Sequence, residues 1–136
     1  MQIAVSVDNN KDVRILPVTP RDVQIGYPLL TEEIDSIKYG QLLVLKSEGL
    51  ATVDISSFFP TKKYPFMQPG STADGWDYVR WFRDNRKKLK PFRVVITSKS
   101  GRTYFNRLMS CNEFQVTGVD GNGDIRYTMS FQQYRK

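Results

Sequence analysis

The feature that most constrains the fold is an alternation of apolar and polar side chains near the carboxyl end of the chain. From Asp124 to Tyr134 the apolar residues stand at every second position, at Ile125, Tyr127, Met129 and Phe131. Because successive side chains of a β-strand point to opposite faces of a sheet, this period of two predicts a strand with one buried face. A shorter alternation of the same kind predicts a strand at residues 2–7.

Two turn sequences divide the residues before this strand. Residues 98–101 and 119–123 contain glycines, which can adopt the positive φ angles that tight hairpin turns need. We therefore predict an antiparallel meander over residues 92–134, with a bulge or bend near Asn112. Its strands are expected at 92–97, 102–105, 108–118 and 124–134.

The amino half predicts shorter strands and two ambiguous segments. Strands are expected at 13–18, 22–27 and 50–60. Residues 33–37 fit either a strand or a helical turn. The run of Leu42, Leu43, Val44 and Leu45 contains no polar residue, so we predict that it is buried on both sides or packed between subunits.

One helix is expected at about residues 75–89, with Ser71 or Asp74 as its N-cap and Pro91 ending it. Trp81 is expected off the apolar stripe of this helix, either as an exposed side chain or as the anchor of an interface, where tryptophan is enriched. The stripe expected to face the core has a spacing of three and consists of Trp76, Val79 and Phe82.

A long loop, about residues 60–75, precedes the helix and is rich in proline and glycine. Loops of this length are usually functional or mobile. Tyr64 and Phe66 within it are candidates for an interface. Phe58 and Phe59 directly before it either close the core or line an interface.

Composition indicates the class of protein. The chain has 136 residues, of which 40% are hydrophobic and 25% charged, so we expect one domain over residues 1–136 with a mainly β, α+β fold. Its longest apolar run is far shorter than a membrane span, and residues 1–8 lack the apolar segment of a signal peptide. We therefore expect no signal peptide and no insertion into a membrane.

Groups suited to catalysis are scarce. The sequence has no histidine and one cysteine, Cys111, which removes the commonest general base and any cysteine-rich zinc site. Glu32, Glu33 and Asp35 are expected to be solvated, and residues 120–124 to form a hairpin turn, because no downstream glutamate completes a calcium loop. We expect a protein that is not an enzyme, with no catalytic residues, no cofactor and no metal site.

Positive charge is concentrated in one segment of this chain, whose net charge is +6. Together with Tyr78 and Trp81, this segment has the mixture of cations and aromatic rings that single-stranded nucleic acids bind. The other interpretation is a solvated helix face whose cations suit the negative carboxyl end of the helix. The basic stripe consists of Arg80, Arg83, Arg86, Lys87, Lys88 and Lys90.

Three stretches of sequence are informative in the order in which they occur along the chain. The first runs from RILPV to DVQI at residues 14–25, and the second is VDISSFFP at 53–60. The third combines DYV at 77–79, KPFRVVIT at 90–97 and YTMSFQQYR at 127–135. In this order they resemble the amino-terminal domain of the LysM-bearing tail and baseplate proteins of PBSX-type prophages and related contractile-tail phages.

The resemblance implies a tail-tube-like β-sandwich or open barrel with a flanking α-helix. It implies a structural tail protein at the junction of baseplate and inner tube, of which six copies form a ring that templates or caps the tube. The implied partners are further copies of the chain, the tail tube protein and other baseplate or hub proteins. The implied location is the virion tail or a phage-like particle, assembled in the host cytoplasm.

The chain departs from the family at its end. The family continues from the YR sequence into a LysM module, whereas this sequence stops at Lys136, so contact with peptidoglycan is not carried over. The chain is then a shorter relative or a tube-adjacent tail protein of the same lineage. The alternative function is a monomeric nucleic-acid-binding β-domain that uses the segment Arg80–Lys90.

Overall fold

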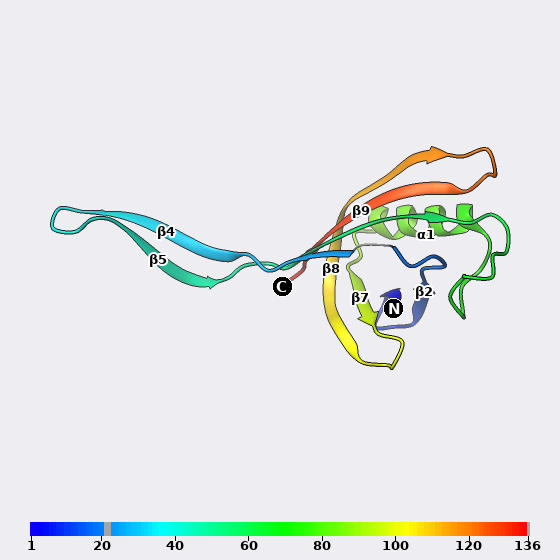
Figure 1. Ribbon diagram of the computed structural model, residues 1–136, viewed down its shortest axis with the longest axis horizontal. Coiled ribbons are helices and arrows are strands. Elements are labelled where there is room, and N and C mark those ends of the chain that lie inside the picture. The colour runs from blue at the N-terminus through cyan, green and yellow to red at the C-terminus, as the bar shows by residue number, and fades with distance from the viewer. Residues whose placement is uncertain (21–22, 136) are drawn as a thin grey trace.

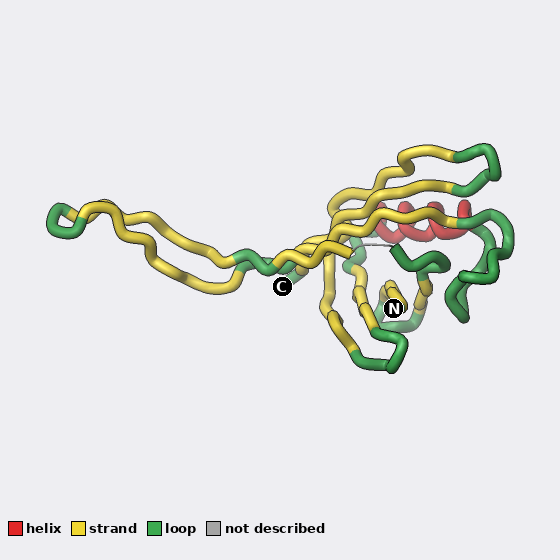
Figure 2. The backbone as a smooth tube through the Cα atoms, in the orientation of Figure 1, coloured by secondary structure: helices red, strands yellow, loops and turns green. Residues whose placement is uncertain are grey.

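The computed structural model describes residues 1–20 and 23–135, which form a seven-stranded antiparallel sheet, a two-stranded hairpin and one helix (Figures 1 and 2). The predicted class, mainly β with one helix, is confirmed. Asp22, expected to begin a strand, lies outside the described residues. The elements are β1 (Gln2–Val7), β2 (Asp12–Ile15), β3 (Val23–Gly26), β4 (Leu29–Ser36), β5 (Gly40–Glu48), β6 (Thr52–Phe59), α1 (Gly75–Lys87), β7 (Phe92–Thr97), β8 (Thr103–Val119) and β9 (Ile125–Gln133).

Strand β8 joins the two halves of the large sheet, whose strand order is β2-β1-β7-β8-β9-β6-β3. Residues 103–109 of β8 pair with β7, and residues 109–119 pair with β9, so the strand changes partner at Met109. The register shifts between Cys111 and Glu113, which confirms the bulge predicted near Asn112. Because bulges bend a strand and increase its twist, β8 curves and the sheet forms an open barrel (Figure 1).

The prediction of two separate strands at 102–105 and 108–118 is wrong, because both belong to β8. Asn106 and Arg107 lie between the two expected strands. Both residues stay within the ladder opposite β7, and the Asn106 side-chain Oδ1 accepts a hydrogen bond from Arg93 Nη1 at 3.0 Å. A polar residue on the solvated face of a strand does not interrupt its backbone pairing.

Helix α1 fills the concave side of the sheet. The Phe82 side chain is fully buried, and its ring centroid lies 5.7 Å from that of Phe92 on β7 and 5.4 Å from that of Phe114 on β8. Tyr78 stacks on Phe59 of β6 at 5.1 Å. Aromatic rings of one helix thus contact both halves of the sheet and form the centre of the core.

The predicted apolar stripe of the helix is wrong at its two tryptophans. Trp76, expected in the core, is 50% exposed, whereas Trp81, expected at the surface, is 7% exposed. A spacing of six residues turns a helix by about 600°, which leaves Trp76 and Phe82 about 120° apart around the axis. The buried face instead follows Tyr78, Trp81, Phe82 and Asn85.

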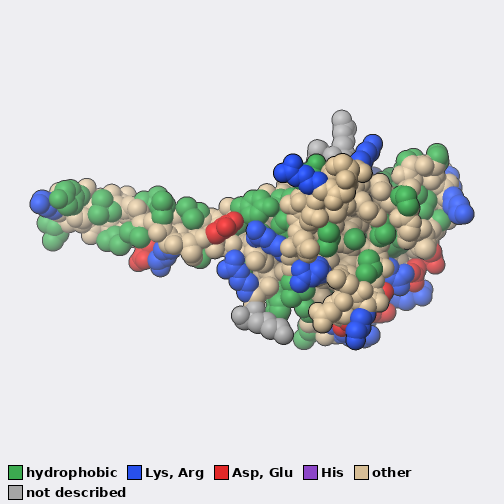
Figure 3. All heavy atoms as spheres, turned by 90° about the horizontal axis from the view of Figure 1, so that it is seen from below, with side chains coloured by type: hydrophobic (Ala, Val, Ile, Leu, Met, Phe, Trp, Pro, Cys, Tyr) green, Lys and Arg blue, Asp and Glu red, His purple; other side chains and the backbone are tan. Residues whose placement is uncertain are grey.

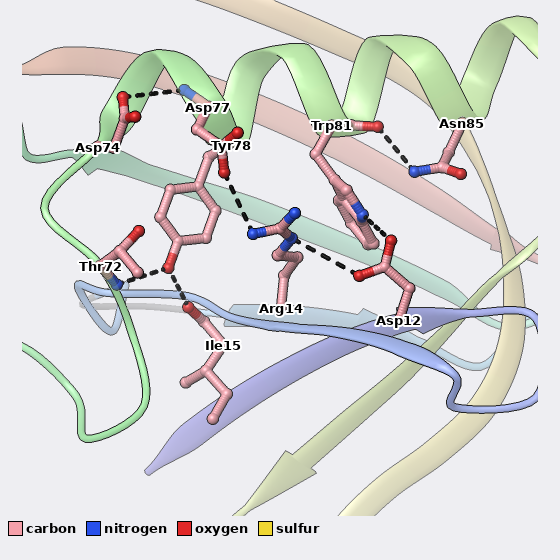
Figure 4. A network of polar contacts seen from close by, with 9 residues as sticks. All are labelled: Asp12, Arg14, Ile15, Thr72, Asp74, Asp77, Tyr78, Trp81 and Asn85. Carbon is pink, nitrogen blue, oxygen red and sulfur yellow. Dashed lines mark hydrogen bonds and ion pairs between the residues drawn. The ribbon is translucent and has the colours of Figure 1, made fainter.

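Polar contacts attach the buried side of α1 to the edge strand β2 (Figure 4). The Trp81 indole Nε1 donates to Asp12 Oδ2 at 2.8 Å, and the Tyr78 hydroxyl donates to the Ile15 carbonyl oxygen at 2.9 Å. Arg14 Nη1 reaches Asp77 Oδ2 at 3.2 Å. These bonds satisfy the polar ends of two buried aromatic rings, which would otherwise be costly to bury.

The ends of α1 match local sequence signals. Of the two candidate caps, Asp74 is the N-cap, and its Oδ1 accepts from the Asp77 amide nitrogen at 3.2 Å. The helix ends at Lys87, two residues before Leu89, whose φ of +59° is left-handed. The chain then enters β7 through Pro91.

The two tryptophans of α1 provide a direct comparison. We expect Trp81→Ala to lower the free energy of unfolding by about 3–5 kcal/mol, because it empties a buried site and leaves Asp12 without its donor. Trp76→Ala should change it by less than about 0.5 kcal/mol, since that ring is half exposed. Urea denaturation followed by circular dichroism measures both. Equal losses for the two variants would contradict this placement of the helix face.

Candidate assembly interface

Strands β4 and β5 form a hairpin that extends away from the sheet and the helix (Figures 1 and 2). The strands pair antiparallel from Leu29 with Glu48 to Ser36 with Gly40, with a register shift between Leu30 and Thr31. A hydrogen bond of 2.7 Å from the Gly49 amide nitrogen to the Pro28 carbonyl oxygen closes the base. An isolated two-stranded hairpin is marginally stable in water, so a long one indicates a segment that is stabilised by a partner.

The prediction that residues 42–45 are buried on both sides is wrong for this chain. The exposed fractions are 42% for Leu42, 60% for Leu43, 38% for Val44 and 66% for Leu45. The run lies in β5, where no other element of the described chain covers either face. Residues 33–37, left open as strand or helical turn, belong to β4 up to Ser36.

The register assigns different chemistry to the two faces of the hairpin. On one face, Ile34 lies opposite Leu42, and Val44 follows on the same side. On the other face, Glu33 lies opposite Leu43, with Leu45 and Asp35 on either side. Figure 3 shows hydrophobic side chains along the length of the hairpin. Contiguous apolar surface outside a core marks an interaction site.

The tip of the hairpin was missed in the sequence. Ile37 and Tyr39 are exposed by 110% and 68%, next to Gly40 with a φ of +75°. The available signal was this glycine between two runs of similar length, which is a hairpin signature. Leu29 and Leu30 at the base are also half exposed.

The predicted basic stripe divides into two groups. Arg86 binds the backbone of β8, with Nε 3.1 Å from the Cys111 carbonyl oxygen, and Lys90 Nζ pairs with Asp8 Oδ2 at 2.8 Å. This ion pair lowers the pKa of Asp8. Lys88 is the C-cap of the helix. The exposed members of the stripe are Lys88 and, on the outer side of the helix, Arg80, Arg83 and Lys87.

This arrangement removes the aromatic half of the expected nucleic-acid site. Tyr78 and Trp81 are 2% and 7% exposed, so neither ring can stack on a base. The aromatic residue that does accompany the exposed cations is Trp76. It lines a shallow groove on the outer side of α1 together with Arg80, Arg83 and Lys87.

The loop before α1 folds onto itself. Tyr64 and Phe66 stack at 4.9 Å, and both meet the edge of the Phe58 ring. The Tyr64 hydroxyl donates to Asp124, and this bond raises the pKa of Tyr64 to about 12. Phe66 remains 54% exposed, so of these two interface candidates it presents the larger apolar surface.

Two other residues singled out in the sequence have structural surroundings. The Cys111 thiol is 7% exposed, and burial raises its pKa to about 12, which makes it a poor nucleophile. Asp120 organises the predicted hairpin turn, with Oδ1 accepting from the amide nitrogens of Asn122 and Asp124 at 2.9 and 3.1 Å.

Within residues 1–20 and 23–135, no group of three or more acidic or cysteine side chains is placed to hold a metal ion. Helix α1, the helix of this described part, is too short and too polar to cross a membrane.

Comparisons with known proteins place the fold. No family model matches the chain. A curated relative, the uncharacterized protein YqbP of Bacillus subtilis strain 168, is 25% identical over 130 residues, which cover 95% of this chain. The chain spans 58% of the length of that relative.

Two solved structures share the fold. One is a chain from the tail of an empty gene transfer agent particle with C6 symmetry, with a TM-score of 0.57 and 14% identity over 100% of this chain and 92% of that chain. The other, from the virion of a native gene transfer agent particle, has a TM-score of 0.55 and 13% identity over 98% of this chain and 92% of that chain. The resemblance to phage-like tail proteins is thus confirmed at the level of the fold.

The hairpin should be the least protected part of the free chain. We expect backbone amides of β4 and β5 to exchange with solvent orders of magnitude faster than those of β8 and β9, because no core covers the hairpin. Hydrogen exchange read by mass spectrometry measures this. Slow exchange in the hairpin of a monomer would show that it is stable without a partner.

Proposed function

We propose that this chain is a structural, non-enzymatic component of a phage-like contractile tail. It acts at the junction of baseplate and tube, where six copies form a ring that starts the tube. The observation that carries the proposal is the hairpin β4–β5, whose exposed aliphatic side chains have no cover within the described chain. The fold shared with a chain of a C6-symmetric tail supports the same conclusion.

The mechanism of such a ring is templating. The large sheet ends at two short edge strands, β2 and β3. The Ile15 carbonyl oxygen on β2 already accepts from Tyr78, so β3 is the edge whose outer backbone groups can pair with a strand of another molecule. A hairpin that binds a surface different from its own gives head-to-tail contacts between copies, which can close into a ring. The finished ring offers its exposed strand edge and loops to the tail tube protein and to other baseplate or hub proteins. The chain would then reside in the tail of a virion or phage-like particle assembled in the host cytoplasm.

Removing the apolar character of the hairpin should prevent assembly without unfolding the chain. We expect the double variant Leu43→Asn, Leu45→Asn to melt like the wild type, since both side chains are at least 60% exposed, but to form no rings. Light scattering gives the mass of the free protein. Electron microscopy of the protein mixed with purified tail tubes shows whether six-fold rings form at tube ends.

The matched control is Leu89→Asn, which removes an 89% exposed leucine from the body, where the left-handed backbone suits asparagine. It should assemble normally. A wild-type chain that stays monomeric and ignores tail tubes would overturn the proposed function. Normal rings from the double variant would overturn the role of the hairpin.

A further inference from the structure

Charge is distributed unequally between the hairpin and the rest of the chain. Residues 29–48 contain four acidic and two basic side chains, a net charge of −2. The whole chain has a net charge of +6, so the remaining residues carry +8. An acidic projection on a basic body is complementary to other copies of the same molecule.

The outer side of α1 offers a matching surface. Trp76, Arg80, Arg83 and Lys87 are spaced by four, three and four residues, which places them on one face of the helix. They line the shallow groove described above together with Val79 and one carboxylate, Asp84, and Trp76 is half exposed there. Within the described residues, none of the three cations forms an ion pair with a carboxylate. We call these four residues the basic helix face.

One face of the hairpin has the complementary chemistry. Glu33 and Asp35 stand about 7 Å apart along β4, with Leu43 opposite Glu33, Gln41 opposite Asp35 and Leu45 opposite Thr31 on the same face. Glu33 Oε2 also accepts a hydrogen bond from Gln41 Nε2 at 2.9 Å at this exposed surface. Successive cations of the basic helix face are about 4.5–6 Å apart along the helix axis. A hairpin face that carries two carboxylates and two leucines can therefore meet a helix face that carries three cations and a tryptophan. Such a contact pairs the charges and covers apolar surface on both sides.

The two surfaces cannot meet within one chain. The hairpin points away from the body that carries α1, along the longest axis of the molecule (Figure 1). We propose that the hairpin of one copy docks on the basic helix face of a second copy. This inference rests on the proposed function and names the acceptor surface of its hairpin. Because donor and acceptor differ, each copy binds one neighbour and is bound by another, as a ring requires.

A charge swap tests the pairing. One variant carries Glu33→Lys and Asp35→Lys, a second carries Arg80→Glu and Arg83→Glu, and a third carries all four changes. We expect each of the first two to weaken self-association at least about tenfold, because like charges then face each other. The third should recover most of the association. Sedimentation equilibrium measures the dissociation constants, and thermal melting confirms that each variant folds.

The control for changed charge alone is Lys99→Glu with Arg102→Glu, in an exposed turn at the opposite side of the body from α1 (Figure 1). It should associate like the wild type. If the four-charge variant fails to fold, Glu33→Gln with Asp35→Asn replaces it. This neutral variant should weaken self-association less than Glu33→Lys with Asp35→Lys does.

Disulfide trapping provides an independent readout. A chain with Leu43→Cys and Arg83→Cys should form covalent oligomers on oxidation, while Cys111 stays silent because it is buried. Two outcomes would overturn this acceptor surface and leave the proposed function intact. In the first, the leucine hairpin variant loses assembly but Arg80→Glu with Arg83→Glu has no effect. In the second, the variant with all four charges exchanged does not recover association. A wild-type chain that neither associates nor cross-links overturns both.

Discussion

The rest of the structure depends on one constraint, which is that a single helix must cover the apolar face of a seven-stranded sheet. Helix α1 has 13 residues and is about 20 Å long. A flat sheet of this width would leave much of its apolar face in water. The sheet bends at β8 instead, so both halves close on the same helix, and Phe82 touches both. The aromatic rings between α1 and the sheet are large enough to fill the space that the bend creates.

The same constraint explains why the hairpin is exposed. With α1 enclosed by the sheet, no further helix of the described chain is available to cover β4 and β5. Their leucines therefore lie in water in the isolated molecule, a state that soluble monomers rarely maintain over a long ribbon. Placing an apolar run where only another molecule can cover it makes folding of the body independent of assembly. This independence is what the proposed function requires of a subunit that folds before it assembles.

The two sides of helix α1 have different surroundings, the core of the molecule on one side and solvent on the other. Its inner side carries aromatic rings whose polar ends bind β2, so the edge of the sheet and the helix are held as one unit (Figure 4). Its outer side carries Trp76 and three cations that the body does not use. Arg86 and Lys90 belong to neither group, because they bind β8 and Asp8. A count of basic residues along the chain therefore overstates the charge available to a partner.

Sequence alone determined the local structure: the alternation from Ile125 to Phe131, the bulge near Asn112 and the Asp74 cap all follow from interactions between near neighbours in the chain. It did not determine what covers each face. Leu42–Leu45 has the composition of a core strand, yet it is exposed, because burial depends on whether another layer lies there. The predicted burial of Trp76 and Trp81 was the reverse of the observed burial for a related reason. A stripe with a spacing of three drifts around the helix axis, and only the contacts of Trp81 with Phe92 and Asp12 select the buried face. Periodicity fixes which side chains share a face, whereas the tertiary structure decides which face meets a partner.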